Sequence, residues 1–309
     1  MRILIIDKLH PSIVPFLEKS GHTVTYAPDI TRSEILSVIS QYEGLILQSK
    51  TKIDPELLDL ATSLRFVGRS GSGLDHIDLE DLRRREITVI NSPEGNKNAV
   101  GEHTTGLILA LLNHFIKSDK EVRSLIWDRE GNRGHELINK TIAIIGFGHM
   151  GQAVASKLHV FGSRILVYDK YHSGFPQPYI HEATMEEIFA EADIITFHIP
   201  LTEETRQMVN ESYLSKFKKP FWIINAARGE ILDTAALISK LESGAILGAA
   251  LDVQENEKLS TLTPTQKANL QKLATFNNVI LTPHVAGWSQ ESNVRNNEVL
   301  VEKISSIGV

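Results

Sequence analysis

The sequence predicts an α/β protein made of two lobes, each a doubly wound parallel sheet, with a cleft between the lobes. Short runs of β-branched and other apolar residues alternate with segments of helical period along most of the chain. This alternation is typical of parallel sheets that are covered by helices on both faces. With 309 residues, the chain is long enough for two compact domains, each with its own hydrophobic core.

The predicted strands fall into two groups, separated by one long helix. The first group is residues 3–6, 23–26, 44–47, 66–67 and 88–90, and the second is residues 141–145, 164–168, 193–197, 221–224, 247–251 and 279–281. Apolar residues at helical spacing predict the long helix over residues 99–116. We expect residues 260–274 to be a surface excursion, and residues 289–307 to be a last helix that packs back on the first lobe.

A glycine fingerprint stands between the first strand of the second group and the helical stretch that follows it. Gly146, Gly148 and Gly151 carry the pattern, with His149 and Met150 between them. The first glycine allows a tight turn, the second a close approach of the backbone to a pyrophosphate, and the third close packing of helix on strand. The helix N-terminus then faces the phosphates, with the His149 side chain either at the pyrophosphate or turned to solvent. This context predicts a dinucleotide-binding Rossmann domain.

Asp169 follows the next predicted strand, about 20 residues after the fingerprint. A carboxylate at this place accepts hydrogen bonds from the adenosine ribose and repels a 2'-phosphate. We therefore expect NAD rather than NADP, although the adjacent Lys170 softens this preference without reversing it. The expected Rossmann domain covers residues 97–285, and a flavodoxin-like substrate-binding domain covers residues 1–96 together with residues 286–309.

Composition argues against several classes of function. The formal net charge of −6 leaves no general footprint for nucleic acid. The absence of cysteine excludes disulfides, thiolate metal sites and a cysteine nucleophile, and the histidines show no spacing with carboxylates that predicts a metal site. There is no signal peptide and no apolar run of the ~18–20 residues that cross a membrane, so we expect a cytoplasmic protein with no membrane partner.

Three polar residues follow the ends of predicted strands in the second lobe: Arg228, Glu257 and His284. In open α/β sheets, ligands gather at the carboxyl ends of the strands. An imidazole suits proton transfer near neutral pH, and a carboxylate can hold it by a hydrogen bond that favours the imidazolium. The donor fork of an arginine matches a substrate carboxylate and polarises the adjacent carbonyl. Together they predict hydride transfer between a nicotinamide cofactor and a hydroxy acid.

The chain resembles the D-isomer-specific 2-hydroxyacid dehydrogenases over nearly its whole length. Five motifs carry the resemblance: the glycine fingerprint with Asp169, residues 198–202 with Thr205, residues 225–229, residues 251–253 with Glu257, and residues 283–287. The resemblance implies that Arg228, Glu257 and His284 are the catalytic trio and that NAD is the cofactor.

The same resemblance assigns further residues to the cofactor and the substrate. It implies that Asp252 contacts the nicotinamide amide. The other cofactor-binding residues that it implies are Ala226, His198, Pro200, Thr205, Thr104 and Gly287. In the first lobe, residues 70–75 look like the family's carboxylate-binding loop, in which the amides of Ser72 and Gly73 form an anion-binding nest, and Asn96 matches a position near the cleft.

Departures from the family pattern bear on the substrate. Gln48 stands where phosphoglycerate dehydrogenases usually carry an arginine, and Lys50 is the residue that could supply the missing charge to the substrate. The substrate pair stays open between phosphoglycerate, glycerate with hydroxypyruvate, and a glyoxylate-like acid. Because the chain ends at Val309, we expect the short form without a regulatory domain.

The resemblance also implies a homodimer that uses the long helix. Because hydride transfer needs a dry, closed site, we further expect the lobes to hinge shut over cofactor and substrate. Two other functions are compatible with this architecture. Formate dehydrogenase shares the architecture, but it needs no acid–base histidine paired with a glutamate. An NAD-sensing corepressor or scaffold could keep the same fold without catalysis, because function belongs to sites rather than to folds.

Overall fold

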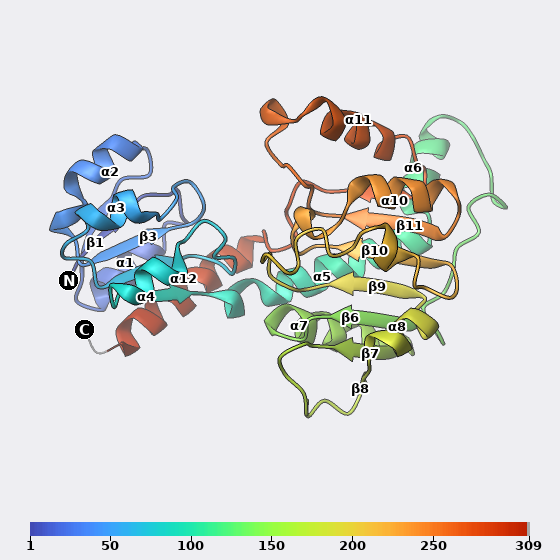
Figure 1. The fold of residues 1–309 in the computed structure, drawn as a ribbon, viewed down its shortest axis with the longest axis horizontal. Helices are drawn as coiled ribbons and strands as arrows, with labels where there is room; N and C mark the ends of the chain where they lie inside the picture. Colours follow the sequence, from blue (N-terminus) through green and yellow to red (C-terminus); the bar gives the residue numbers. More distant parts are fainter. Residues whose placement is uncertain (308–309) are drawn as a thin grey trace. The chain divides into compact units, whose positions relative to one another are not determined.

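The computed structural model describes residues 1–307, which form two compact units (Figure 1). Unit 1 is Met1–Lys97 together with the segment from Trp288 onward, and unit 2 is Asn98–Gly287. Each unit is built around one parallel sheet. No helix between residues 1 and 307 combines the length and the apolar character that a bilayer crossing requires.

Unit 1 contains a five-stranded parallel sheet with the strand order β2-β1-β3-β4-β5. This is the flavodoxin-like order of a doubly wound sheet. Its strands are β1 (Arg2–Ile5), β2 (Thr23–Tyr26), β3 (Gly44–Leu47), β4 (Phe66–Arg69) and β5 (Thr88–Asn91). Its helices are α1 (Ile13–Lys19), α2 (Arg32–Val38), α3 (Pro55–Leu60), α4 (Leu79–Arg84) and α12 (Gln290–Ser306).

The side chains of β1 alternate between two cores, one on each face of this sheet. Ile3 and Ile5 pack with residues of α1 and α12, whereas Leu4 packs with residues of α2 and α3. All three side chains are fully buried, as a central strand covered on both faces requires. Helix α12 is therefore part of the core of unit 1, although the whole of unit 2 separates it from β1–β5 in the sequence.

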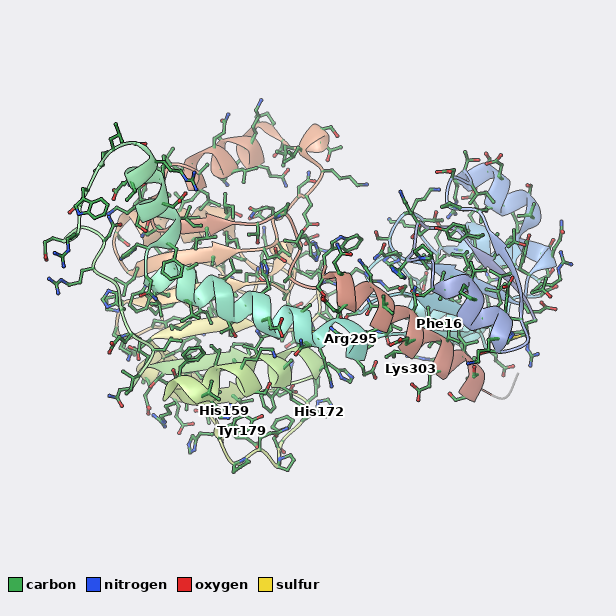
Figure 2. All side chains as sticks on the ribbon, turned by 180° about the vertical axis from the view of Figure 1, so that it is seen from behind. Phe16, His159, His172, Tyr179, Arg295 and Lys303 are labelled. Carbon is green, nitrogen blue, oxygen red and sulfur yellow. The ribbon has the colours of Figure 1, made fainter. Side chains whose placement is uncertain are left out.

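Polar contacts also hold α12 to unit 1. Arg295 donates from Nε to the carbonyl oxygen of Gly95 at 3.1 Å, and the ammonium of Lys303 bonds to the Glu94 carboxylate at 2.8 Å (Figure 2). The helix begins after Ser289, whose hydroxyl accepts a hydrogen bond from a main-chain amide in the first turn.

Unit 2 contains a seven-stranded parallel sheet with the order β12-β11-β10-β9-β6-β7-β8. Counted from β6, this is the Rossmann order 3-2-1-4-5-6 with one further strand at the outer edge beside β11. Its strands are β6 (Thr141–Ile145), β7 (Arg164–Tyr168), β8 (Ile180–Glu182), β9 (Ile194–Phe197), β10 (Phe221–Asn225), β11 (Ile246–Leu251) and β12 (Val279–Leu281). The remaining helices are α5 (Pro93–Leu112), which begins in unit 1, α6 (Phe115–Arg123), α7 (His149–Leu158), α8 (Met185–Glu191), α9 (Glu211–Leu214), α10 (Thr234–Glu242) and α11 (Pro264–Leu273). Short 3-10 turns lie at Ile39–Gln41, His159–Phe161, Gly229–Ile231 and Leu259–Thr261.

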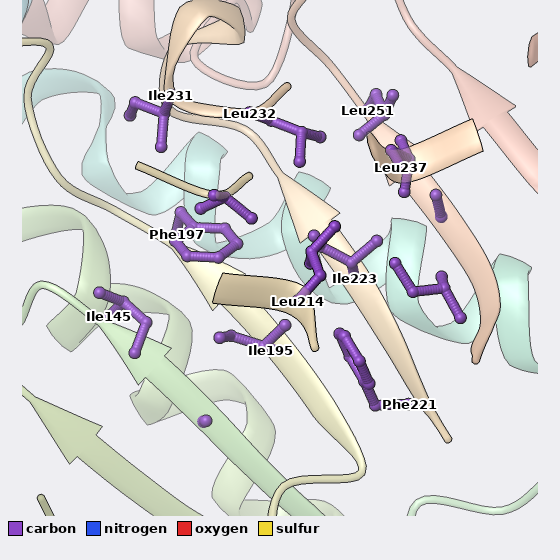
Figure 3. Packing of buried hydrophobic residues seen from close by; sticks show 14 of the residues in the cluster. Ile145, Ile195, Phe197, Leu214, Phe221, Ile223, Ile231, Leu232, Leu237 and Leu251 are labelled. Carbon is purple, nitrogen blue, oxygen red and sulfur yellow. The ribbon is translucent and has the colours of Figure 1, made fainter. Parts of the chain in front are cut away.

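The central strand of unit 2 divides its side chains in the same way. Ala143 and Ile145 of β6 belong to one core, and Ile142 and Ile144 belong to the core on the other face. Figure 3 shows part of the first core, where side chains of β6, β9, β10 and β11 pack together. Both faces of the sheet are therefore closed, and the loops at the carboxyl ends of its strands start from a rigid base.

Three elements differ from the sequence-based expectation. The helix expected over residues 99–116 is interrupted between α5 and α6, because His114 adopts the left-handed conformation with a φ of 53°. The expected excursion 260–274 contains the regular helix α11, since Pro264 stands at its first position, where a proline favours a helix, and Thr263 caps it. The edge strand β8 was not predicted, because it has only three residues and the last two, His181 and Glu182, are polar.

Candidate active site

The glycine loop between β6 and α7 fits the backbone of a dinucleotide. Gly146 has a φ of 87°, and a Cβ atom there would lie 2.6 Å from the carbonyl oxygen of His198. A Cβ atom at Gly151 would lie 2.1 Å from the carbonyl oxygen of Gly146, so only glycine lets α7 pack this closely on β6. At Gly148 a Cβ atom would meet nothing within 4 Å, which leaves open space at the helix N-terminus. The loop thus has the turn, the packing and the open face that a pyrophosphate needs.

Asp169 follows β7 and bonds directly to the glycine loop. Its Oδ2 accepts a hydrogen bond from the amide of Phe147 at 2.8 Å, and its Oδ1 accepts from the amides of Tyr171 and His172 at 3.0 and 3.1 Å. Burial raises the pKa of Asp169, but these hydrogen bonds outweigh burial and hold the pKa below its ordinary value. Asp169 also lines a depression of about 490 Å³ beside β7 and β8. It is therefore an ionised carboxylate that a ligand can reach.

The residues after β9 form a compact loop next to the glycine turn. The Nε2 atom of His198 lies 3.0 Å from the hydroxyl of Thr196, and burial lowers the pKa of His198 to about 4. His198 is therefore neutral near neutral pH. Thr205 donates from its hydroxyl to the carbonyl oxygen of Pro200 at 2.7 Å, which closes the loop on itself.

Arg228 lies in a tight turn after β10 that packs against the loop after β11. The buried side chain of Asn225 shapes the turn, because it accepts from the amide of Ala227 at 3.0 Å and donates to the carbonyl oxygen of Arg228 at 2.9 Å. A Cβ atom at Gly229 would lie 2.0 Å from the carbonyl of Gln254, so only glycine permits this contact between the two loops. The guanidinium of Arg228 donates from Nη1 to the carbonyl oxygen of Ala227 at 2.7 Å.

Asp252, at the end of β11, organises the loop that follows β12. Its carbonyl oxygen accepts a hydrogen bond from the amide of His284 at 2.7 Å. Its carboxylate accepts from the amides of Val285 and Ala286 at 2.9 and 2.8 Å and from the hydroxyl of Thr282 at 2.5 Å. Asp252 has no exposed surface, so the structure shows it positioning this loop, and its contact with a nicotinamide amide stays a prediction.

The side chain of Glu257, in the loop after β11, contacts the side chain of His284, in the loop after β12. Both oxygens of the Glu257 carboxylate lie 2.9 Å from Nδ1 of His284. Because a carboxylate only accepts, Nδ1 is the donor, and Nε2 is left to exchange a proton with a ligand. The side chains keep 42% and 45% of their surface exposed. The backbone of His284 is left-handed, with a φ of 56°, a strained conformation that the hydrogen bonds of the loop maintain.

In unit 1, the loop after β4 carries two of the predicted substrate residues. Ser72 donates from its hydroxyl to Oδ1 of Asn96 at 2.6 Å, and its carbonyl oxygen accepts from the side chain of Asn91 at 2.8 Å. Within residues 1–307, the amides of Ser72 and Gly73 donate to no acceptor. Both N–H groups are therefore available to an anion, as a nest requires.

Lys50, the residue that sequence reasoning offered in place of an arginine, is held by main-chain oxygens. Its Nζ donates to the carbonyl oxygens of Pro28 and Ile30, each at 2.7 Å. The carboxylate of Asp7 accepts from the amides of Ser49 and Lys50 at 2.8 and 3.2 Å. Two of the three N–H groups of the ammonium are thus used inside unit 1.

The structure also places the remaining predicted residues and one that was missed. Thr104 is fully buried on α5, and its hydroxyl has no hydrogen-bond partner among the residues described, so it is not accessible to a cofactor here. His149 is exposed, whereas Met150, Ala226 and Gly287 are half-buried.

His103 was not predicted, although its Nε2 lies 3.5 Å from Oδ1 of Asp252 and 3.4 Å from the Thr282 hydroxyl. The sequence feature that could have pointed to His103 is its position directly before Thr104, which the family resemblance assigns to the cofactor site.

Known proteins resemble the chain in both sequence and fold. The family model described as D-isomer specific 2-hydroxyacid dehydrogenase, NAD binding domain, matches residues 105–286. A hydroxypyruvate reductase of Thermotoga maritima is 32% identical, over 98% of this chain and 97% of the relative. The structure of a D-lactate dehydrogenase of Aquifex aeolicus, solved with NAD and lactic acid, has a TM-score of 0.85 and 26% identity, with 100% of this chain and 95% of that chain covered.

Some of the curated relatives are much longer than this chain. A D-3-phosphoglycerate dehydrogenase of Archaeoglobus fulgidus is 31% identical over 98% of this chain but only 56% of the relative. The chain therefore spans about half the length of the phosphoglycerate dehydrogenases that it matches.

Proposed function

Because the chain belongs to the D-isomer-specific 2-hydroxyacid dehydrogenase family, we propose that it is an oxidoreductase that transfers a hydride between NAD(H) and a D-2-hydroxy acid or its 2-oxo acid. The observation that carries the proposal is the contact of His284 with Glu257 at 2.9 Å, at the carboxyl end of the sheet. A protein that only senses NAD has no need of an imidazole held by a carboxylate at this place.

The residues present fit NAD. Gly146, Gly148 and Gly151 would hold the pyrophosphate, since they provide the turn, the open face and the close helix packing described above. Asp169 would accept hydrogen bonds from the adenosine ribose and would repel a 2'-phosphate. When bound, NAD supplies the hydride acceptor, and NADH the hydride donor, for the redox step.

His284 would move the proton of the reaction. In reduction of a 2-oxo acid, the imidazolium gives its Nε2 proton to the carbonyl oxygen as that oxygen becomes a hydroxyl. In oxidation, the neutral ring takes the hydroxyl proton back. Glu257 accepts from Nδ1 and so keeps the ring orientation and stabilises its charged form. Asp252 holds the loop in which His284 lies.

Arg228 would bind the substrate carboxylate and polarise the neighbouring carbonyl. The guanidinium presents parallel donors that match two carboxylate oxygens, and its charge stabilises negative charge that develops on the carbonyl oxygen. Support comes from the rigidity of the turn, which Asn225 and Gly229 fix against the loop after β11.

The proposed substrate is a small 2-oxo acid without a phosphate. Gln48 provides no cation, and the ammonium of Lys50 already donates to two carbonyl oxygens. A phosphate would therefore have to compete with these main-chain acceptors for Lys50. Ser72 and Gly73 are proposed to bind a carboxylate through their free amides, because a nest of N–H groups suits a small anion.

We place the proposed homodimer contact on α6 and the segment after it. Six large apolar side chains are exposed there: Phe115, Ile116, Val122, Leu125, Ile126 and Trp127. Leu125 is 95% exposed and Trp127 is 80% exposed. Apolar patches of this kind mark protein–protein interfaces, and a second copy of the chain is the partner most consistent with the symmetry of soluble oligomers.

A panel of 2-oxo acids tests the activity. Glyoxylate, hydroxypyruvate, pyruvate and 3-phosphohydroxypyruvate are each mixed with protein and NADH, and NADH absorbance is followed. We expect an unphosphorylated acid to give the highest kcat/KM, and Arg228→Gln to lower that value about 100-fold. If no acid oxidises NADH while NADH binds normally, the NAD-sensing alternative replaces the proposal.

A further inference from the structure

We propose that Glu204 is a determinant of cofactor selectivity, because it occupies the ammonium of Lys170 next to the expected ribose site. Lys170 directly follows Asp169, at the end of β7. A cation near this acidic position is the feature by which Rossmann domains accommodate a 2'-phosphate. A free Lys170 would therefore offset the repulsion that Asp169 exerts on NADPH.

The two oxygens of Glu204 are both used by the loop that follows β7. Lys170 donates from Nζ to Oε1 of Glu204, and Tyr171 donates from its hydroxyl to Oε2 at 3.2 Å. The Lys170 ammonium also lies 5.6 Å from the centre of the Tyr171 ring. Glu204 itself belongs to the loop that follows β9, which Thr205 closes through its bond to Pro200. The contact thus ties the two loops on either side of β6 to each other.

The contact keeps both partners charged. The hydrogen bond from Lys170 lowers the pKa of Glu204, and the same bond raises the pKa of Lys170. An incoming 2'-phosphate would have to displace Glu204 from Lys170, and it would meet the carboxylates of Asp169 and Glu204 together. The side chains of Lys170 and Glu204 remain 51% and 53% exposed, so solvent screens the pair and the effect of removing Glu204 is a modest one.

The neighbouring residue Glu203 provides a matched control. It carries the same charge on the same loop and is exposed, whereas the Lys170 ammonium bonds to Glu204. Glu204→Gln and Glu203→Gln therefore change the net charge equally, and only the first removes the anion that pairs with Lys170, because glutamine accepts a hydrogen bond but carries no charge. Both substitutions are made in an Asp169→Asn background, where the strongest repulsion of the 2'-phosphate is already removed.

The readout is equilibrium binding of NADPH and NADH, measured by cofactor fluorescence, with thermal unfolding of each variant as a check on folding. We expect D169N/E204Q to bind NADPH about threefold to fivefold more tightly than D169N/E203Q, with little change for NADH. Adding Lys170→Met should remove this gain, since the gain depends on the positive charge of Lys170 that Glu204 no longer neutralises.

Two results would overturn the proposal. One is equal NADPH affinity in D169N/E204Q and D169N/E203Q, and the other is a gain that survives Lys170→Met. Neither result depends on the 2-oxo acid, so both are distinct from a failure of the proposed reaction, which would leave NADH binding intact.

Discussion

The carbonyl oxygen of Asp252 accepts a 2.7 Å hydrogen bond from the amide of His284. A buried acidic residue at the end of β11 therefore fixes the backbone that follows the neighbouring strand β12. The carboxylate of Asp252 adds bonds to Val285 and Ala286. These bonds hold His284 in its left-handed conformation and keep its ring against Glu257. In the proposed reaction, Asp252 would therefore position the loop and His284 would transfer the proton.

Asp252→Asn should weaken both stability and activity. An amide has only one acceptor oxygen, so at least one of the loop amides loses its partner inside the protein. We expect a loss of about 1–3 kcal/mol in the free energy of unfolding, measured with urea, and a lower kcat for the best 2-oxo acid. An unchanged stability together with an unchanged kcat would show that the loop does not depend on this carboxylate.

His284→Asn should strongly lower turnover while the fold is kept. The substitution removes the proposed proton donor, and we expect kcat to fall about 100-fold to 10,000-fold. Asparagine tolerates left-handed backbone well, so the melting temperature should stay close to that of the original protein. His181→Asn, a control on the edge strand β8, should retain full activity. A His284→Asn variant with normal kcat would refute the assignment of the proton donor.

Glu257→Gln should lower kcat more than it raises KM. Glutamine can still accept from Nδ1 of His284, but it carries no charge to stabilise the imidazolium. We expect kcat to fall at least about tenfold, with the KM values of NADH and of the 2-oxo acid nearly unchanged. Initial-rate kinetics over both substrates give this split, and a pure rise in KM would instead assign Glu257 to binding.

His198 should make the protein less stable in mild acid. Its pKa in the folded protein is about 4, below the value of about 6.5 expected in the unfolded chain. As the pH falls below about 6.5, the unfolded state therefore binds a proton that the folded state does not, and stability declines until about pH 4. By about pH 5 the decline should reach up to about 2 kcal/mol.

The variant His198→Gln tests this origin of the acid sensitivity. Glutamine keeps a polar group near the Thr196 hydroxyl but does not titrate. Urea unfolding at about pH 8 and at about pH 5 should show a smaller difference in the variant than in the original protein. An equal difference in both proteins would assign the acid sensitivity to other groups.

The double substitution Leu125→Ser with Trp127→Ser should shift the protein toward monomer. It removes two of the most exposed apolar side chains of the proposed contact. Sedimentation velocity over a range of concentrations measures the shift. Leu259→Ser, which removes another highly exposed leucine of unit 2, should leave the dimer in place. A dimer that is unaffected by the double substitution would place the interface elsewhere.

Much of the fold could be predicted, because the strands are short apolar runs bounded by turn residues. All eleven predicted strands are present, with ends that differ by at most two residues. The break at His114 could not be predicted, because the left-handed backbone of a single histidine interrupts an otherwise continuous apolar pattern. Likewise, β8 depends on pairing with β7 rather than on any pattern of its own.

Within the candidate site, the contact between Glu257 and His284 could be predicted, because each residue follows the end of a strand. Glu257 and His284 come after β11 and β12, which are neighbours in the sheet, so topology alone brings their loops together. The position of Lys50 depends instead on which carbonyl oxygens a long, flexible side chain meets, and no spacing in the sequence encodes that. The burial of Asp252 is set by packing of several segments, so its role in the loop emerged only from the structure.

The interrupted course of unit 1 has a consequence for synthesis on the ribosome. The segment that forms unit 2 is continuous, so it can fold as soon as it has emerged from the ribosome. One hydrophobic face of β1, in contrast, cannot be covered until Leu300 and Ile304 of α12 have been synthesised. Until then, Ile3 and Ile5 lack part of their cover in the nascent polypeptide. Chaperones that recognise exposed aliphatic strands would therefore meet the first-made part of the chain throughout translation of the second.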